Sequence, residues 1–137
     1  MSDHKRHLDW LAAHHAQEVI RKTGGEKASD VDNTVTKSLG VLQENGIYAC
    51  ALFLKSRPQV EQDRAEAVMS EMLNLLAALG FGWERPRSNR AADVLQHISD
   101  RVTSDKLERL LLAKETLEQM LTYARYGAKA RKAGEGG

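Results

Sequence analysis

The sequence predicts an all-α protein, a single compact bundle of five to six helices that occupies residues 1–132. Apolar residues recur at spacings of three and four along most of the chain, as they do on the buried face of a helix. No segment shows the alternation of apolar and polar residues that marks a half-buried strand. One domain is expected because no linker divides the chain, and 137 residues suffice for one hydrophobic core.

Capping residues and glycines bound the first two helices. The first helix is expected from about Asp3, its N-cap, to about Lys22, where a pair of glycines ends it. The second begins near Ser29 and ends at Asn45-Gly46, because glycine enters the left-handed conformation without steric cost.

A short third helix is expected over residues 47–54, which are apolar all round. Such a segment predicts either a central helix with no solvent face or a buried strand, since periodicity alone does not separate the two. The absence of strands elsewhere favours the helix, and Pro58 ends it.

Three further helices complete the predicted bundle. One covers residues 60–79, and a short one is capped by Ser88 or Asn89. The longest runs from about 105 to 130, and a disordered tail is expected at 133–137. The main apolar stripe of the longest helix consists of Leu107, Leu110, Leu111, Leu117, Leu121, Ala124 and Ala128.

Composition is that of a globular protein, with 42% hydrophobic and 28% charged residues. No apolar run reaches the ~18 residues of a membrane span, and the N-terminus carries no apolar stretch long enough for a secretory signal. The single cysteine excludes an internal disulfide framework and a cysteine-rich zinc site. We therefore expect a soluble, cytoplasmic protein with no membrane partner.

Charge is distributed unevenly along the chain. The net charge of +1 excludes strong global attraction to nucleic acid, but it leaves room for a local basic patch. Residues 1–84 hold 9 Lys and Arg against 12 Asp and Glu, whereas residues 85–137 hold 11 against 7. The basic C-terminal third is either a face for an anionic partner or a solvated surface.

Histidine and cysteine form no recognisable catalytic or metal-binding motif. His4 and His7 are one helical turn apart, but no third ligand has suitable spacing. His15 lies on the apolar stripe of the first helix, which predicts a hydrogen-bonded core histidine. Cys50 lies in the most apolar segment, without the basic surroundings of a reactive thiolate. We predict no catalytic residue, no metal and no cofactor.

One arrangement leaves an enzymatic alternative open. Arg90 and His97 are seven residues apart, so they share one side of a helix. The spacing resembles the Arg–six residues–His motif of HEPN-domain ribonucleases, where the histidine would move the 2′-hydroxyl proton and the arginine would stabilise the phosphate charge. Those enzymes usually have a polar residue after the arginine, where this chain has Ala91.

Surface residues offer a second route to function, through binding. Basic groups beside the loop aromatic Trp83 suit contacts to phosphates together with packing on a base or ribose. Trp10, Leu112 and Tyr123 lie off the main apolar stripes, which predicts either a central helix or a partner contact. The candidate RNA-binding residues are Lys37, Lys55, Arg57, Arg85, Arg87, Arg90, Arg101, Lys114, Arg125 and Lys129.

Three segments carry a family resemblance. Residues 37–47 (KSLGVLQENGI) lead into 51–56 (ALFLKS), and residues 121–130 (LTYARYGAKA) close the last helix. These resemble the central Asn-Gly motif, the apolar run ending in Phe-Leu and Lys/Ser, and the closing helix of the small helical subunit of type III-B (Cmr) CRISPR–Cas effector complexes. In this chain Gly40 stands where the family usually has a proline.

The resemblance implies a non-catalytic structural subunit of an RNA-guided antiviral complex. Several copies would stack beside other subunits, line the groove that holds the guide RNA and target RNA, and contact the RNA backbone. Cleavage of the target would belong to other subunits. A helical adaptor for proteins, without a nucleic-acid role, is the remaining alternative.

Overall fold

The computed structural model describes the backbone of residues 2–136 and side chains within residues 7–135. Within this range the predicted fold class is confirmed, because the chain forms six α-helices and no strand. Their bounds are α1 (Ser2–Lys22), α2 (Ala28–Asn45), α3 (Ile47–Lys55), α4 (Gln62–Ala78), α5 (Ala91–His97) and α6 (Leu107–Gly136). A short 3₁₀ turn precedes α4 at Gln59–Glu61, and a π turn extends α5 at Ile98–Val102.

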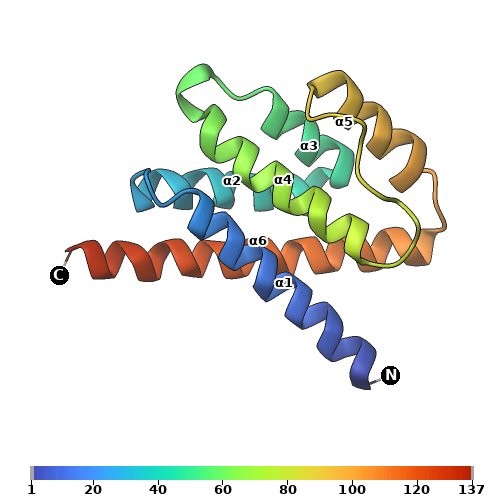
Figure 1. The fold of residues 1–137 in the computed structure, drawn as a ribbon, viewed down its shortest axis with the longest axis horizontal. Coiled ribbons are helices and arrows are strands. Elements are labelled where there is room, and N and C mark those ends of the chain that lie inside the picture. The colour runs from blue at the N-terminus through green and yellow to red at the C-terminus, as the bar shows by residue number, and fades with distance from the viewer. Residues whose placement is uncertain (1, 137) are drawn as a thin grey trace.

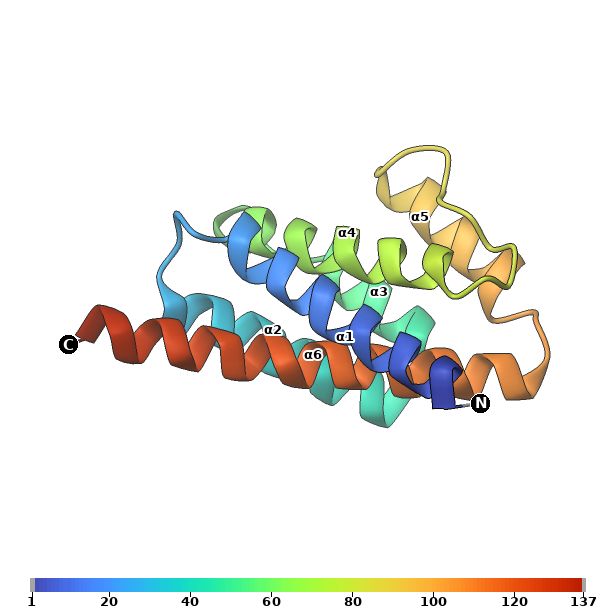
Figure 2. The same cartoon turned by 60° about the horizontal axis from the view of Figure 1, so that its bottom comes forward.

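The long helix α6 runs the length of the molecule, and α1 and α2 pack against it (Figure 1). In the view of Figure 2, α4 lies above α1, and α3 lies beside α2 and α4. Helix α5 covers the end of the bundle next to α3. No helix among the described residues is long and apolar enough to cross a membrane.

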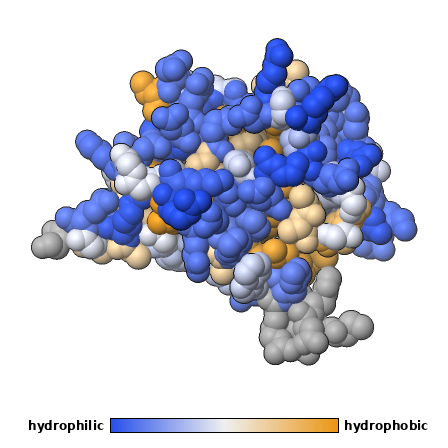
Figure 3. Space-filling model, in the orientation of Figure 1, coloured by the Kyte–Doolittle hydropathy of each residue, from blue (hydrophilic) through white to orange (hydrophobic). Residues whose placement is uncertain are grey.

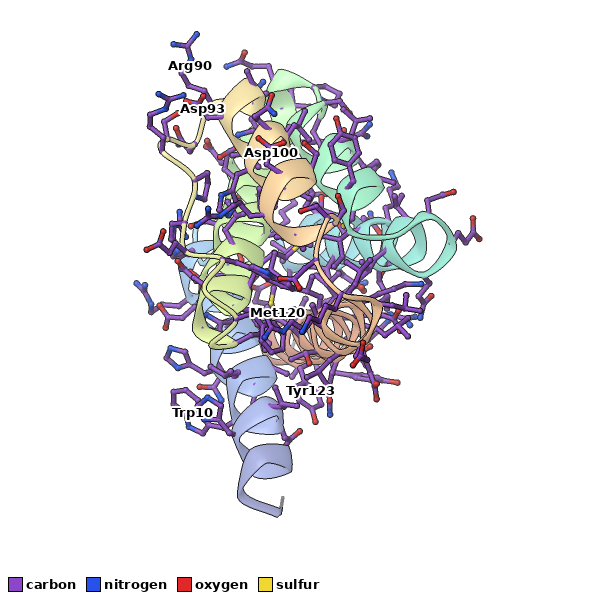
Figure 4. All side chains as sticks on the ribbon, turned by 90° about the vertical axis from the view of Figure 1, so that its right-hand side faces the viewer. Trp10, Arg90, Asp93, Asp100, Met120 and Tyr123 are labelled. Carbon is purple, nitrogen blue, oxygen red and sulfur yellow. The ribbon has the colours of Figure 1, made fainter. Side chains whose placement is uncertain are left out.

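One hydrophobic core joins these helices. Met120 of α6 lies near its centre and is fully buried (Figure 4). Close packing of α1 on α6 depends on Gly127, because a Cβ atom there would lie 3.0 Å from Cγ1 of Ile20. The buried members of the core include Leu11, Val19, Val35, Leu42, Leu54, Met72, Leu76, Ile98, Leu117, Met120 and Leu121.

Gly46 separates α2 from α3, as the sequence predicts. Its φ of 96° lies in the region that glycine alone adopts readily. Its N–H donates to the carbonyl of Leu42 at 3.0 Å, and its carbonyl accepts from the N–H of Cys50 at 3.1 Å. The same residue therefore ends one helix and begins the next.

Helix α3 differs from the fully enclosed helix that its composition predicts. Tyr48 is 40% exposed and Leu52 is 48% exposed, one turn apart on the same side of the helix. The opposite side, with Cys50 and Leu54, packs against α2 and α4. The prediction of no solvent face is wrong because α3 lies at the edge of the bundle rather than at its centre.

The first turns of α6 also differ from the prediction. Leu107 and Leu111 belong to the predicted buried stripe, yet they are 66% and 57% exposed. Helix α2 ends near Lys114, whose Nζ donates to the carbonyl of Gln43 at 3.3 Å. Because α2 does not extend further, the buried face of α6 begins only at Ala113.

The C-terminal end of α6 is longer than expected. The helix continues to Gly136, through residues that composition assigns to a disordered tail, and residue 137 lies outside the described part. Arg131 donates to the carbonyls of Thr23 at 3.0 Å and Glu26 at 2.6 Å, and its Nε lies 3.3 Å from Glu135. These contacts hold the last turns of α6 against the loop between α1 and α2. Backbone hydrogen bonds continue the helix beyond Arg131.

Candidate nucleic-acid interface

The predicted basic residues fall into two regions of the molecule. Lys114, Arg125 and Lys129 lie on α6 where it runs beside α2, and we call this strip the α2–α6 edge. Most of the remaining candidates surround α5 and the loop that leads into it. The surface in Figure 3 is largely hydrophilic, with hydrophobic residues visible only in limited areas.

Two cations share one carboxylate on the α2–α6 edge. Asp32 of α2 is 17% exposed and lies 3.4 Å from Nζ of Lys129 and 4.0 Å from Nε of Arg125. Asp32 also accepts a hydrogen bond from Thr36 at 3.0 Å. Nε of Arg125 is buried and has no hydrogen-bond acceptor among the described residues. The group carries one surplus positive charge and one N–H without an acceptor.

Two other candidates lie near this edge without joining the group at Asp32. Lys114 donates to the carbonyl of Gln43 and lies 4.0 Å from Glu118, so its charge is partly compensated. Lys37 is exposed and forms no ion pair with a described residue. It lies about 140° around α2 from Asp32, so it extends the positive surface outward rather than along α6.

Lys55 has an internal role. Its side chain is only 9% exposed, and Nζ contacts Glu66 at 2.5 Å and the carbonyl of Asn89 at 2.6 Å. It therefore joins α3 to α4 and to the loop before α5. Arg57 is also held locally, 4.0 Å above the ring of Phe53, where its Nε donates to a backbone carbonyl.

Three arginines around α5 contact residues of α4, of α5 and of the loop between them. Arg85 donates to the carbonyl of Ser70 at 3.1 Å and to the side chain of Asn74. Arg101 lies 3.5 Å from Glu84. Arg87 is 87% exposed and lies 3.7 Å from Asp93, so it is the least tightly held of these three arginines. Only part of this predicted basic cluster faces solvent without strong internal partners.

Trp83 is buried, so the expectation that it packs on a base or ribose is wrong. It is 2% exposed and donates its indole N–H to Asp105 at 2.7 Å. The ring of Phe81 packs edge-on against it, with centroids 5.1 Å apart. Trp83 is a core residue that attaches the α4–α5 loop to the start of α6.

The arrangement of Arg90 and His97 does not bring the two groups into one pocket. Arg90 is the N-cap of α5 and projects away from the helix (Figure 4), where it borders a hollow shared with Lys55 and Glu66. His97 lies at the other end of α5, in a separate hollow of about 300 Å³. Burial lowers the pKa of His97, with a further contribution from the charge of Arg101.

His15 and Cys50 both lie in the core, as the sequence predicts. Nδ1 of His15 lies 2.7 Å from Oε1 of the buried Glu71, so His15 is a hydrogen-bonded core histidine. Cys50 is buried, which raises the pKa of its thiol to about 12. The side chain of His4 lies outside the described part. No group of three metal-ligating side chains occurs among the described residues.

Two contacts between distant helices are not predicted by the sequence. Asp32 organises the α2–α6 edge, and Lys22 binds the buried Glu71. Both contacts join helices that are far apart in sequence, so helical spacing carries no signal of them.

A comparison of the chain with protein-family models, curated proteins and solved structures finds no match.

Proposed function

We propose that this chain is a non-catalytic small subunit of an RNA-guided type III-B CRISPR effector complex in the cytoplasm, and that it contacts the RNA backbone through the α2–α6 edge. The resemblance of residues 37–56 and 121–130 to the Cmr small subunit supports the proposal, and an all-helical fold agrees with it. Its partners are other subunits, copies of itself, and the backbones of guide RNA and target RNA.

The observation that carries the RNA contact is the unequal charge at Asp32. Two cations approach this one carboxylate, so the group keeps one surplus positive charge. A phosphate oxygen beside the accessible parts of Arg125 and Lys129, which are 40% and 46% exposed, would supply the missing negative charge, and charge-assisted bonds of this kind are stronger than neutral ones. The edge is therefore suited to bind a phosphate, and a contact of this kind does not depend on the base sequence.

The protein contacts of the proposal rest on exposed apolar residues. Tyr48 and Leu111 border a common hollow between α3 and the start of α6, and Leu52 and Leu107 lie one turn from them. Exposed apolar groups gathered in this way are typical of surfaces that bind other proteins. We assign this patch to contacts with other subunits.

Binding by one copy is expected to be weak. The net charge is +1, and the α2–α6 edge offers few cations, so each subunit neutralises few phosphates. Several copies in an assembly would add their contacts along one RNA. Affinity of the assembly for RNA should therefore fall steeply with salt concentration, whereas the isolated chain binds only at low ionic strength.

The test is a charge reversal on the assembled complex. Lys37→Glu together with Lys129→Glu should weaken binding of target RNA and flatten its salt dependence, while assembly persists. Lys106→Glu is the control for a single reversal, because this exposed lysine lies before α6, away from Asp32, and makes half the charge change of the double variant. Normal assembly with unchanged affinity and salt slope in the double variant would refute the proposed RNA contact.

The two alternatives are separated by simple measurements. A HEPN-like ribonuclease would cleave RNA with the purified chain in the presence of EDTA, and the activity would need Arg90 and His97. A helical adaptor without a nucleic-acid role would show no salt-dependent retention on RNA. Isolation of the native complex with short RNAs that share a repeat-derived tag would favour the proposed function over both.

A further inference from the structure

A hollow of about 330 Å³ lies between α4 and the segment that follows it. Residues 79–90, which we call the return segment, form no helix and turn back alongside α4 before α5 begins (Figure 1). Side chains from α1, α3, α4, α5 and the return segment line the hollow. We call it the Ser70 hollow, after the residue of α4 at which its polar groups converge. Because its walls come from several elements, it can enclose a small molecule on more than one side.

Hydrogen bonds from two cations hold the return segment beside the hollow. Arg85 donates through Nη1 to the carbonyl of Ser70 at 3.1 Å and to the side-chain oxygen of Asn74. Lys55, whose side chain is almost fully buried, donates to the carbonyl of Asn89 at 2.6 Å. Both cations are therefore ordered before a ligand binds, which lowers the entropy lost on binding.

Hydrogen-bond donors from three elements converge on Ser70. Nζ of Lys22, at the end of α1, lies 3.5 Å from the hydroxyl oxygen of Ser70, while Arg85 binds the carbonyl. Among the described residues, no group accepts the hydroxyl proton of Ser70 or the N–H groups on Nε and Nη2 of Arg85. An ammonium, a guanidinium and a hydroxyl group are therefore able to donate to one ligand.

The charges around Arg85 favour an anion. Lys22 is paired with the buried Glu71, and Lys55 is paired with Glu66. Arg85 contacts only neutral oxygens and forms no ion pair with a described residue. Its charge is therefore the uncompensated one in this part of the hollow, and a ligand that brings negative charge there gains a charge-assisted hydrogen bond.

The opposite end of the hollow carries a carboxylate. Asp63 is exposed and forms no ion pair with a described residue. It lies seven residues before Ser70 on the same side of α4, which separates the two residues by about 10 Å along the helix axis. The hollow therefore suits a ligand with a negative charge at one end and hydrogen-bond donors, without negative charge, at the other.

From this geometry we infer that the Ser70 hollow binds a phosphomonoester, with the phosphate beside Ser70, Lys22 and Arg85. A phosphomonoester carries a charge of about −1.5 to −2 at pH 7 and presents three strong acceptor oxygens, which match the three donor groups. The body of the ligand extends toward Asp63, whose carboxylate accepts hydrogen bonds from an amino group. A nucleotide with an amino-bearing base combines the two features.

The phosphate of a nucleic-acid backbone is a poorer occupant of this hollow. A phosphodiester carries a single negative charge, and its chain continues in both directions beyond a hollow of this volume. A phosphomonoester comes from one of two sources, a free nucleotide or the 5′-terminal nucleotide of an RNA. The inference therefore goes beyond the proposed function, which concerns backbone phosphates at the α2–α6 edge.

Titration of the purified chain with adenosine 5′-monophosphate (AMP) and with adenosine tests the phosphate contact. AMP should bind about ten-fold or more tightly than adenosine, because hydrogen bonds to a charged group contribute at least this much. Isothermal titration calorimetry measures both affinities. In NMR spectra, the backbone amide resonances of Ser70 and Arg85 should shift with AMP and with inorganic phosphate, and adenosine should leave them unchanged.

Two variants test the donor groups. Ser70→Ala removes the hydroxyl group but keeps the carbonyl that Arg85 binds, so the return segment stays in place and AMP binding should weaken. Arg85→Gln removes the uncompensated charge and should weaken AMP binding about ten-fold. Arg87→Gln is the matched control, because this arginine of the return segment makes the same charge change but lines the hollow beside His97 instead. Its affinity for AMP should equal that of the wild-type protein.

Two short RNA strands that differ only at the 5′ end identify the source of the phosphate. Tighter binding of the 5′-phosphorylated strand than of the 5′-hydroxyl strand, with the difference lost in Ser70→Ala, assigns the hollow to an RNA terminus. Binding of AMP without a preference between the strands assigns it to a free nucleotide. Either result supports a phosphomonoester site.

The outcomes that overturn the inference differ from those that test the proposed function. Equal affinity of the wild-type protein for AMP and adenosine overturns it, as does unchanged affinity for AMP in either Ser70→Ala or Arg85→Gln. Lys37→Glu with Lys129→Glu should leave AMP binding unchanged while it weakens binding of target RNA. Loss of AMP binding in that double variant would place the phosphate at the α2–α6 edge, which overturns the Ser70 hollow as its site and leaves the proposed RNA contact intact.

Discussion

Glu71 of α4 and His15 of α1 meet in the interior of the bundle, with 2.7 Å between Oε1 and Nδ1. Lys22 and Asn74 also donate to this carboxylate. Burial by itself raises the pKa of Glu71, but the bonds from His15, Lys22 and Asn74 outweigh it and lower the pKa to about 2. One buried negative charge therefore holds α1 against α4.

This carboxylate predicts a loss of stability in acid. Its folded-state pKa is about 2 against an ordinary value of 4.5, so its contribution is complete above pH 4.5 and disappears as the pH falls toward 2. The shift corresponds to roughly 3 kcal/mol of unfolding free energy. Glu71→Gln should lower stability at pH 7 and remove most of the decrease between pH 4.5 and 2. Urea denaturation across this pH range measures both effects.

Glu18→Gln is the matched control. Glu18 lies on α1, the helix that Glu71 contacts from α4. The variant also removes a carboxylate, but the ion pair of Glu18 with Arg21 lies at the surface. Exposed pairs contribute little, so stability and its pH dependence should remain close to those of the wild-type protein. An equal effect of the two variants would contradict the role assigned to Glu71.

Gly46 provides a second prediction, on backbone conformation. Gly46→Val places a β-branched residue at a φ of 96°, which should destabilise the protein by about 1–3 kcal/mol. Gly40→Ala is the control, because a Cβ atom there meets no other atom within 4 Å and the residue is inside α2. The control should be neutral or more stable by about 0.5–1 kcal/mol. Thermal denaturation compares them, and unchanged stability with reduced partner or RNA binding in Gly46→Val would show that Gly46 is a binding residue instead.

Local signals account for what the sequence predicts correctly. Helical spacing, the glycine at position 46 and the position of His15 on an apolar stripe each depend on neighbours in the chain, and the structure agrees with all three. Exposure of Leu107 and Leu111 depends instead on where α2 ends against α6, which sequence periodicity does not contain.

The candidate site was harder to predict for the same reason. Basic residues are visible in the sequence, but their partners are not. The sequence suggests that Lys55 is a surface lysine, but in the structure it contacts Glu66 and Asn89. It suggests that Trp83 is an aromatic residue of a loop, but in the structure Asp105 accepts its N–H. Composition therefore identified the charges, whereas the packing of distant helices decides which of them face solvent.

A third prediction concerns the ribonuclease alternative. Arg90→Ala and His97→Ala should each leave any nuclease activity of the assembled complex intact, because the two side chains border separate hollows at opposite ends of α5. Cleavage of labelled target RNA by complexes containing each variant is the measurement. A large loss of cleavage with assembly preserved in either variant would make the HEPN-like function the leading one.

The last prediction concerns Trp83, which secures the loop between α4 and α5. Trp83→Phe keeps an aromatic ring but removes the N–H that Asp105 accepts at 2.7 Å, so a buried contact is lost along with part of the ring volume. We expect a loss of roughly 1–3 kcal/mol in unfolding free energy. Trp10→Phe is the control, because the same replacement at an exposed site should change stability little. Hydrogen exchange should also rise in residues 80–90 of Trp83→Phe, since this loop then loses its attachment to the start of α6. Equal stability of the two variants would show that the bond to Asp105 does not hold the loop in place.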